Sequence, residues 1–442
     1  MCRESTAREK QNYRGDKMIG ELKRNVSIIG VGCTPFGDVL KTPEIKGMTM
    51  RELYSWACLE AMEDAGIEAK DIDAFFIGQC MGETLCHQFA PYSAVAEWIG
   101  MRNKPGFHHE SACSTTNAGL TLAALSVASG RYDIVLSGGV EITNSRPKEG
   151  MPACYREAMS PGELWYKTNY GADQAYWYPT GLAVGAFGDV PTMAYAKKYG
   201  LSLEQMEDAL NAAAINNRRN AVRNPLATIS TKEFKDEARE HGFDDVMEYM
   251  KSKYNPYSTY PLRVFNCATP VDGASALIVC PSEMAKKFTD TPIDVIGFGT
   301  AVGVLYRETE AYWQMDKAAF EQAYKMAKID PKNIDYMHCH DCMVNSHFMV
   351  SEEAGYFPKG EAWKAIIEGR TAFDGDKPIS TTGGRTSLGH AWAASAGAEI
   401  TEAVRQMRGE CDKRQIKPEP ELCVVHNWGH GPHCNISVLR RR

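Results

Sequence analysis

The stretch Glu110-Ser-Ala-Cys-Ser-Thr-Thr-Asn-Ala-Gly119 places one cysteine, Cys113, among small and hydroxyl residues. An apolar helical pattern follows it as far as Gly130. Ser114 and its neighbours are typical of helix starts, so the sequence predicts Cys113 at the N-terminal end of a helix. There the helix dipole would favour a thiolate, which makes Cys113 a candidate nucleophile. A buried structural cysteine is the competing interpretation, and this stretch alone leaves both open.

Length and composition are those of an ordinary globular protein. The chain has 442 residues, 44% of them hydrophobic and 24% charged, enough for two or three structural units. A net charge of −7 without a basic stripe argues against nucleic-acid binding. No apolar run approaches the roughly 18 residues of a membrane span, and the start of the chain does not resemble a secretory signal. Fourteen scattered cysteines indicate reduced thiols and hence a cytoplasmic protein.

Strand-like and helix-like stretches alternate along the chain. The patterns predict strands near 26–31, 72–77, 107–110 and 133–136, with helices between 49 and 66 and between 114 and 130. From residue 292 a similar order returns, with strands at 293–297, 334–339, 422–425 and 435–439 and helices at 316–327, 345–354 and 391–407. The alternation predicts an α/β fold with a largely parallel sheet covered on both faces. The returning order predicts a duplicated unit.

A long insertion separates the two copies. We expect residues 1–17 to be a flexible extension, and residues 18–145 plus 262–290 to form the first half. Residues 146–261 would be the insertion and residues 291–442 the second half. The insertion is rich in Tyr, Trp, Gly and Pro, which indicates a loop-rich subdomain that covers the substrate. Aromatic packing within such a layer is the alternative interpretation.

Three further motifs carry residues able to do chemistry. His340-Asp-Cys342 follows a predicted strand, at the end where open α/β sheets place their ligands. Gly383-Gly-Arg-Thr-Ser-Leu-Gly-His390 is a glycine-rich loop that delivers a histidine to the start of a small-residue helix. His426-Asn-Trp-Gly-His-Gly431 turns between two strands near the C-terminus.

Together with the Ser-Ala-Cys-Ser stretch, these motifs stand in the order found in the thiolase superfamily. The chain resembles that superfamily from Met18 onward, and most closely its sterol-carrier-protein-type branch. The resemblance implies a duplicated thiolase fold of two α-β-α-β-α layered halves with a loop-domain insertion. It implies an acyltransferase, an acyl-CoA C-acyltransferase with coenzyme A as co-substrate and no bound cofactor. It also implies a dimer or tetramer.

The resemblance also implies roles for individual residues. Cys113 matches the nucleophile that becomes acylated, and His390 the histidine that takes its proton. His340 matches the group that, with a water, forms the oxyanion hole for the thioester oxygen. The backbone amides of Cys113 and Gly429 would form the second oxyanion hole.

One departure from ordinary thiolases concerns the second catalytic cysteine. The glycine spacing places Asn427 where ordinary thiolases carry it. The sterol-carrier-type branch uses the cysteine of His-Asp-Cys instead, so Cys342 inherits that role. We expect Cys342 to keep an unshifted pKa near ~8.5, acidic enough to give and recover a proton.

Three alternative functions stay open at this stage. Condensing enzymes of the ketoacyl-synthase type use one cysteine with two histidines, and Cys342 argues against them. Retro-aldolases of the same fold tend to lack the nucleophile, and Cys113 argues against those. A non-catalytic acyl-CoA-binding scaffold would have no reason to keep Cys113, His340, Cys342 and His390 together.

Two clusters could be mistaken for metal sites. One comprises His338, Cys339, His340 and Cys342, and the other His426, His430, His433 and Cys434. Neither has a standard zinc spacing, so we expect no metal. For the histidines of the second cluster, polar positions on a surface turn are the simplest interpretation.

The identity of the substrate is the most specific inference drawn from the sequence. The nearest resemblance is to the thiolase subunits of benzoylsuccinyl-CoA thiolases of anaerobic toluene degradation, which release benzoyl-CoA and succinyl-CoA. Candidate substrate-binding residues are Tyr166, Trp177, Arg385, His426 and Asn427. Arg156, Lys167 or Arg385 could hold a second carboxylate, although most such side chains are simply solvated at a surface.

A partner subunit is also implied. Bacterial thiolases of this kind often work with a small zinc-ribbon/OB-fold protein that is encoded separately. This chain has no pair of Cys-X-X-Cys motifs, so such a module would be another polypeptide.

Overall fold

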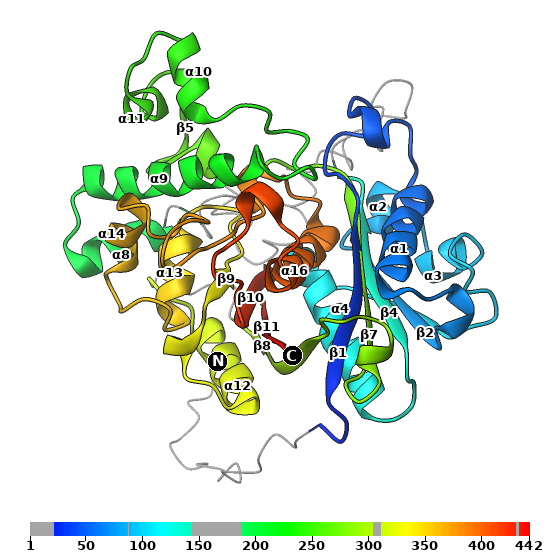
Figure 1. Ribbon diagram of the computed structural model, residues 1–442. Coiled ribbons are helices and arrows are strands. Elements are labelled where there is room, and N and C mark those ends of the chain that lie inside the picture. The colour runs from blue at the N-terminus through cyan, green and yellow to red at the C-terminus, as the bar shows by residue number, and fades with distance from the viewer. Residues whose placement is uncertain (1–21, 87, 144–187, 189, 304–310, 430–432) are drawn as a thin grey trace, which may run out of the picture.

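The computed structural model describes residues 22–86, 88–143, 188, 190–303, 311–429 and 433–442 (Figure 1). Nine of the described strands form one sheet in the order β3-β2-β4-β7-β1-β8-β11-β10-β9. Their bounds are Val26–Cys33 (β1), Ala74–Gly78 (β2), Gly106–His109 (β3), Val135–Glu141 (β4), Gly273–Pro281 (β7), Ile293–Val302 (β8), Tyr336–His338 (β9), Leu422–Gly429 (β10) and His433–Arg441 (β11). Tyr257–Thr259 (β5) and Leu262–Arg263 (β6) form a separate small sheet.

The helices complete the two halves. Those of the first half are Met50–Ala65 (α1), Gly82–Leu85 (α2), Pro91–Val95 (α3) and Thr115–Ala128 (α4). Val190–Tyr199 (α8), Leu203–Ala221 (α9), Phe234–Glu240 (α10) and Val246–Met250 (α11) lie in the insertion. The second half has Gln314–Ala327 (α12), Ser346–Glu353 (α13), Ala362–Ile367 (α14), Gly384–Ser387 (α15) and Trp392–Arg408 (α16).

The prediction of a largely parallel sheet is wrong for the central strands of the sheet. β2 runs parallel to both β3 and β4, and β9 runs parallel to β10. The other pairings, β1 with β7 and β8, β4 with β7, and β11 with β8 and β10, are antiparallel. The connection between β10 and β11 is short, which only an antiparallel pair allows. The alternation of strands and helices along the chain does not show where two consecutive strands pair directly with each other.

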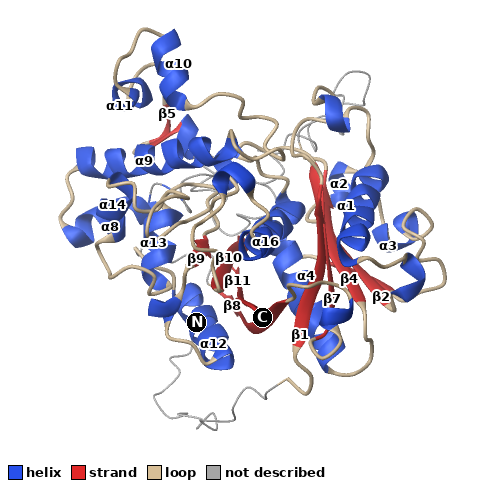
Figure 2. Ribbon diagram, viewed as in Figure 1, coloured by secondary structure: helices blue, strands red, loops and turns tan. Residues whose placement is uncertain are grey.

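The predicted duplication is confirmed by the order of strands. β2-β4-β7-β1 in the first half corresponds to β9-β10-β11-β8 in the second. The two sets join where β1 pairs with β8, with Val26 opposite Val295. α4 and α16 pack against each other and each contacts strands of both halves, while α1 and α12 cover outer faces. Figure 2 shows α4 and α16 between the two sets of strands.

Two pairs of glycines let an outer helix approach the first strand of each half. A Cβ on Gly30 or Gly32 of β1 would lie 2.2 or 2.1 Å from a backbone oxygen of α1. A Cβ on Gly297 or Gly299 of β8 would lie 2.4 or 1.9 Å from a backbone oxygen of α12. The same device at equivalent places in both halves shows that helix and strand backbones are in direct contact there.

Glu141 ends β4 with a fully buried carboxyl group. Its oxygens accept the backbone N–H groups of Cys80 at 2.7 Å and Met81 at 3.3 Å. Burial nevertheless raises its pKa from 4.5 to about 7, because desolvation disfavours the carboxylate more than these bonds favour it. The carboxyl group therefore ties the segment before α2 to the end of β4.

The domain boundaries drawn from the sequence remain a prediction, and residues 1–17 lie outside the described residues. α9 to α11 share an apolar cluster with the second half through side chains such as Leu210, Phe234 and Met250. No described helix is long and apolar enough to cross a membrane. The described cysteines are all free.

Gly299→Ala should destabilise the protein by about 3 kcal/mol, because the new methyl group overlaps the Ala319 carbonyl oxygen and α12 must move. Gly130→Ala is the matched control. Gly130 has a φ of 78° and open space around it, so only backbone strain, about 1 kcal/mol, is expected. Denaturant unfolding measures both, and equal effects would contradict direct backbone contact at Gly299.

Glu141→Gln should flatten the pH dependence of stability. The folded pKa of about 7 lies above the unfolded value of 4.5, so the native state holds the extra proton between them. Stability from this group is therefore present at low pH and is lost as pH rises through 7. Relative to Glu141→Gln, the wild type should lose about 2–3 kcal/mol of unfolding free energy between pH 5 and 8. Parallel pH profiles of the two proteins would refute the raised pKa.

Candidate active site

Cys113 lies in a tight turn immediately before α4, as the sequence predicts. The turn is the 3-10 segment Ala112–Ser114 (η3), and Ala112 adopts a φ of 45°, unusual for a residue with a side chain. Thr115 holds it in place: its Oγ1 donates to the Ala112 carbonyl oxygen at 2.5 Å and accepts the Ser111 N–H at 2.9 Å. Strained backbone at such a position is common where a side chain is aimed at a reaction centre.

The charge state of Cys113 differs from the expectation. Burial raises the pKa of the thiol to about 12, and the nearby Arg385 guanidinium only partly opposes this effect. The helix N-terminus therefore does not make Cys113 a resting thiolate. A neighbouring base must remove its proton during reaction.

His390 is the candidate for this base. Its Nδ1 is within 2.9 Å of Ser395 Oγ, whereas its Nε2 is buried without a hydrogen-bond partner among the described residues. Burial, with a contribution from Arg385, lowers the pKa of His390 well below 6.5, so the imidazole is neutral. Trp392, two residues on, shares a small buried apolar cluster with Cys113 and Leu85.

His340 lies beside His390, with ring centroids 5.9 Å apart. Its Nδ1 accepts the backbone N–H of Trp428 at 3.1 Å, and its Nε2 lies 3.2 Å from Arg385 Nη1. Burial lowers the pKa of His340 well below its usual value, and Arg385 lowers it further. His340 is therefore a neutral, firmly positioned imidazole.

Arg385 was expected at a surface or on a substrate carboxylate, and the structure corrects the surface interpretation. The side chain is 1% exposed and forms a bidentate pair with Glu399, with nitrogen–oxygen distances of 2.6 and 3.0 Å. Its backbone N–H donates to Asp341 Oδ1 at 2.8 Å. A Cβ on the preceding Gly384 would lie 2.0 Å from Asp341 Oδ2, so glycine is required for this approach.

Cys342 contacts the same centre from the loop after β9. Its backbone carbonyl oxygen accepts the Ala268 N–H at 2.7 Å, and its thiol interacts electrostatically with Cys113 and Arg385. The expectation of an unshifted pKa is wrong, because burial raises the pKa of Cys342 strongly. Both thiols are therefore protonated at rest.

The expected surface positions on β10 are buried. His426 Nδ1 accepts the His340 backbone N–H at 3.3 Å, and its Nε2 faces Asp316 Oδ1 at 3.3 Å, so both ring nitrogens are occupied. Asn427 accepts from Asn117 at 2.8 Å and donates to Glu399. Each side chain fastens β10 to the core, and the expected role of both in substrate binding stays a prediction.

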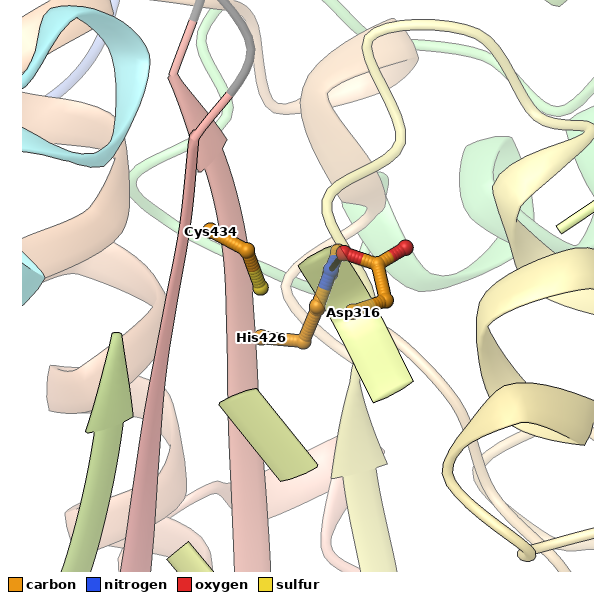
Figure 3. A group of neighbouring side chains, drawn as sticks. All are labelled: Asp316, His426 and Cys434. Carbon is orange, nitrogen blue, oxygen red and sulfur yellow. Dashed lines mark hydrogen bonds and ion pairs between the residues drawn. The ribbon is translucent and has the colours of Figure 1, made fainter. Parts of the chain in front are cut away.

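Asp316, His426 and Cys434 form the one compact group of possible metal ligands found among the described residues (Figure 3). Hydrogen bonds already account for the group. His426 Nδ1 accepts the His340 backbone N–H, so a hydrogen on Nε2 points toward Asp316. Asp316 also accepts the Trp428 Nε1–H at 2.7 Å. The group thus supports Trp428 and His340, and the expected absence of a metal remains a prediction.

The other histidines and cysteines of the two metal-like clusters have separate roles. His338 Nε2 is within 2.9 Å of Thr382 Oγ1, and Cys339 is buried in the core of the second half. His433 Nε2 is within 2.6 Å of Ser111 Oγ, next to the nucleophile turn. Tyr166, Trp177, Arg156, Lys167 and His430 lie outside the described residues.

Three residues of this centre were missed from the sequence. Glu399 is the first acid after a run of small residues in its helix, and a charge directly after that run was the available signal. Trp428 lies inside the motif that runs from His426 to Gly431, and its ring stacks on that of Trp313 with centroids 4.3 Å apart. Asp316 had no local signal, since it opens an amphipathic helix like any capping acid.

The structure thus gathers Cys113, His340, Cys342 and His390 around one buried cation, Arg385. Two protonated thiols and two neutral imidazoles in a desolvated pocket suit acyl transfer to sulfur. One imidazole can take a thiol proton, the other can donate to an oxyanion, and the second thiol can exchange a proton with a carbanion.

Comparisons with known proteins agree with this chemistry. The thiolase N-terminal domain family matches residues 26–283, and the family of thiolase C-terminal domain-like sequences matches residues 304–440. An acetyl-CoA acetyltransferase of Methanothermobacter thermautotrophicus is 32% identical over 92% of this chain and 96% of its own length. Benzoylsuccinyl-CoA thiolase subunit BbsB of Thauera aromatica is 27% identical over 93% of this chain and 96% of its own length.

Two further likenesses concern the branch and the fold. Sterol carrier protein 2 of Rattus norvegicus is 25% identical over 94% of this chain and 72% of its own length. The solved structure of the Ltp2-ChsH2(DUF35) aldolase superposes with a TM-score of 0.74 at 20% identity, over 95% of this chain and 99% of that one. The chain is therefore an acyltransferase that belongs to the thiolase superfamily, in its sterol-carrier-protein-type branch.

Proposed function

We propose that this protein cleaves a β-oxoacyl-CoA by thiolysis with coenzyme A, through an acyl group on Cys113. The observation that carries the proposal is the buried Cys113 thiol in a centre whose neutral base, His390, has an unoccupied Nε2 among the described residues. The same groups catalyse the reverse Claisen condensation, because each step is reversible.

In the first half-reaction His390 takes the Cys113 proton and the sulfur attacks the ketone carbon. The backbone N–H groups of Cys113 and Gly429 bind the ketone oxygen as negative charge develops on it. The bond between the α and β carbons then breaks, and its electron pair forms the enolate of the departing acyl-CoA. Cys342 gives its proton to that carbanion, leaving an acyl group on Cys113 and a thiolate on Cys342.

In the second half-reaction coenzyme A enters and the Cys342 thiolate takes the proton of its thiol. The coenzyme A sulfur attacks the acyl carbonyl, the Cys113 sulfur leaves, and protonated His390 returns the proton to it. The desolvated thiols fit these roles, because a raised thiol pKa makes the corresponding thiolate a strong nucleophile or base.

For the substrate we propose benzoylsuccinyl-CoA, cleaved to benzoyl-CoA and succinyl-CoA in anaerobic toluene degradation. Support comes from the likeness to subunit BbsB over almost the whole of both chains. The word subunit in that name, and the second component in the name of the aldolase structure, also support a separate small zinc-ribbon/OB-fold partner. We propose a homodimer or tetramer as the core of the assembly, and a cytoplasmic location.

Cys113→Ala should abolish thiolysis, with a fall of about 10⁴-fold or more, because the mutation removes the sulfur that carries the acyl intermediate. Intact-protein mass spectrometry of the wild type treated with substrate should show one acyl adduct, at Cys113. Cys280→Ala, a buried core cysteine in β7, should leave both adduct and rate unchanged. Carbon–carbon cleavage that survives in Cys113→Ala would indicate a retro-aldol reaction instead.

Among aryl and alkyl β-oxoacyl-CoA esters assayed with free coenzyme A, benzoylsuccinyl-CoA should give the highest kcat/KM. The chain should be assayed alone and as isolated from its native host with any bound partner. A preference for acetoacetyl-CoA would overturn the substrate proposal without touching the thiolase mechanism. Full activity of a homo-oligomer isolated without a second polypeptide would overturn the partner proposal.

A further inference from the structure

The hydrogen bonds around the His340 ring do not balance. Two N–H donors face it: the Trp428 backbone at 3.1 Å from Nδ1 and Arg385 Nη1 at 3.2 Å from Nε2. A neutral imidazole offers one lone pair, because its other nitrogen carries hydrogen. One of the two donors therefore faces another N–H group.

The fold decides which nitrogen of His340 carries the hydrogen. The Trp428 N–H belongs to the backbone of β10, and Trp428 is held by its ring nitrogen on Asp316 and by its stacking on Trp313. That donor cannot turn away, so Nδ1 accepts it and the hydrogen of His340 is on Nε2. His340 Nε2–H and Arg385 Nη1–H thus lie side by side, and an oxygen acceptor shared by both would satisfy them.

Glu399 holds Arg385 so that Nη1 is the nitrogen that lies next to His340. Its Nε and Nη2 donate to the two oxygens of Glu399 at 2.6 and 3.0 Å. Glu399 is in turn fixed by the Asn427 side chain. Both members of the ion pair are 1% exposed, so the position of Nη1 is set by the core and not by solvent.

We propose that Arg385 is a catalytic residue whose Nη1–H, together with His340 Nε2–H, binds the thioester oxygen of the substrate. The inference rests on the proposed thiolysis and adds a second protein donor to the first oxyanion hole. When the carbon–carbon bond breaks, its electron pair passes into the enolate, whose oxygen receives the charge between these two donors. Cys342 then delivers its proton to the α carbon and the enolate collapses to the thioester.

The charge balance favours a thioester oxygen over a substrate carboxylate. Glu399 already neutralises Arg385, so a second carboxylate would leave the buried centre with a net negative charge, whereas a thioester oxygen is neutral when the substrate binds. A single fixed donor suits an oxygen that is neutral in the bound substrate and negative in the transition state. Such donors cost no reorganisation during the reaction, which is why they lower barriers.

Arg385→Lys tests the proposal, because lysine keeps the charge beside Glu399 and removes the Nη1 donor. Arg414→Lys is the matched control. Arg414 pairs with Glu402, which lies on α16 as Glu399 does, at a nitrogen–oxygen distance of 2.8 Å. Both side chains are at most 5% exposed. The Arg414→Lys variant shows what an Arg-to-Lys change in a buried ion pair does to folding alone. Arg385→Gln with Glu399→Gln, a neutral amide pair, replaces the single variant if that does not fold.

Two partial reactions separate the proposed role from a structural one. Acyl exchange between benzoyl-CoA or acetyl-CoA and labelled coenzyme A needs Cys113, His390, Cys342 and the second oxyanion hole, but not the first. Exchange of the α protons of succinyl-CoA or acetyl-CoA with deuterated water needs the enolate and therefore the first hole. Arg385→Lys should lower α-proton exchange and full thiolysis by about 10²–10³-fold and change acyl exchange by no more than about threefold. Arg414→Lys should change neither by more than about threefold.

The contrary outcomes are distinct. Equal loss of both partial reactions in Arg385→Lys would make Arg385 a structural residue, and retention of both would remove it from the mechanism. A raised KM confined to succinyl-CoA and benzoylsuccinyl-CoA, with kcat intact, would assign it to a substrate carboxylate. Absence of acyl exchange in the wild type would instead refute the proposed function itself.

Discussion

The buried ion pair between Arg385 and Glu399 is the constraint on which the catalytic centre depends. Two opposite charges without access to water are tolerated only when they are close and fully hydrogen-bonded, and here both oxygens of Glu399 accept from the guanidinium. Burial lowers the pKa of His340 and His390 and the cation lowers it further, so both imidazoles stay neutral. It also partly offsets the burial that raises the pKa of both thiols. Burial and this one ion pair together therefore set the protonation states of the four side chains.

The duplicated fold explains how residues from distant segments reach that pair. α4 and α16 pack together between the two sets of strands, so the turn that carries Cys113 meets the start of the helix that follows His390. The outer helices are held against β1 and β8 by glycines that leave no room for a side chain. Because both halves are built on direct backbone contact, the loops at their ends have little freedom to shift relative to one another.

β10 connects these parts. Consecutive residues on this strand serve opposite faces, as the pleat requires. His426 and the Trp428 ring reach Asp316 on one side, and the Trp428 backbone holds the His340 ring. Asn427 points to the other side, where it joins Asn117 of α4 to Glu399 of α16. The strand thereby fixes His340 and the Arg385–Glu399 pair relative to α4, the helix that follows Cys113.

The sequence by itself determined the position of Cys113 before a helix, the order of elements in two copies, and the four motifs that meet in the centre. These features depend on periodicity, capping residues and glycine spacing, all of which act over a few neighbouring residues. Only the tertiary structure decided the strand directions, the burial of His426 and Arg385, and the protonation of the two thiols. Those properties depend on what each group is packed against, and the partners are remote: Asp316 and His426 are 110 residues apart, and Asn117 and Asn427 are 310 apart. Burial and hydrogen bonding of these groups arise only when remote segments come together, so no local sequence pattern could have predicted them.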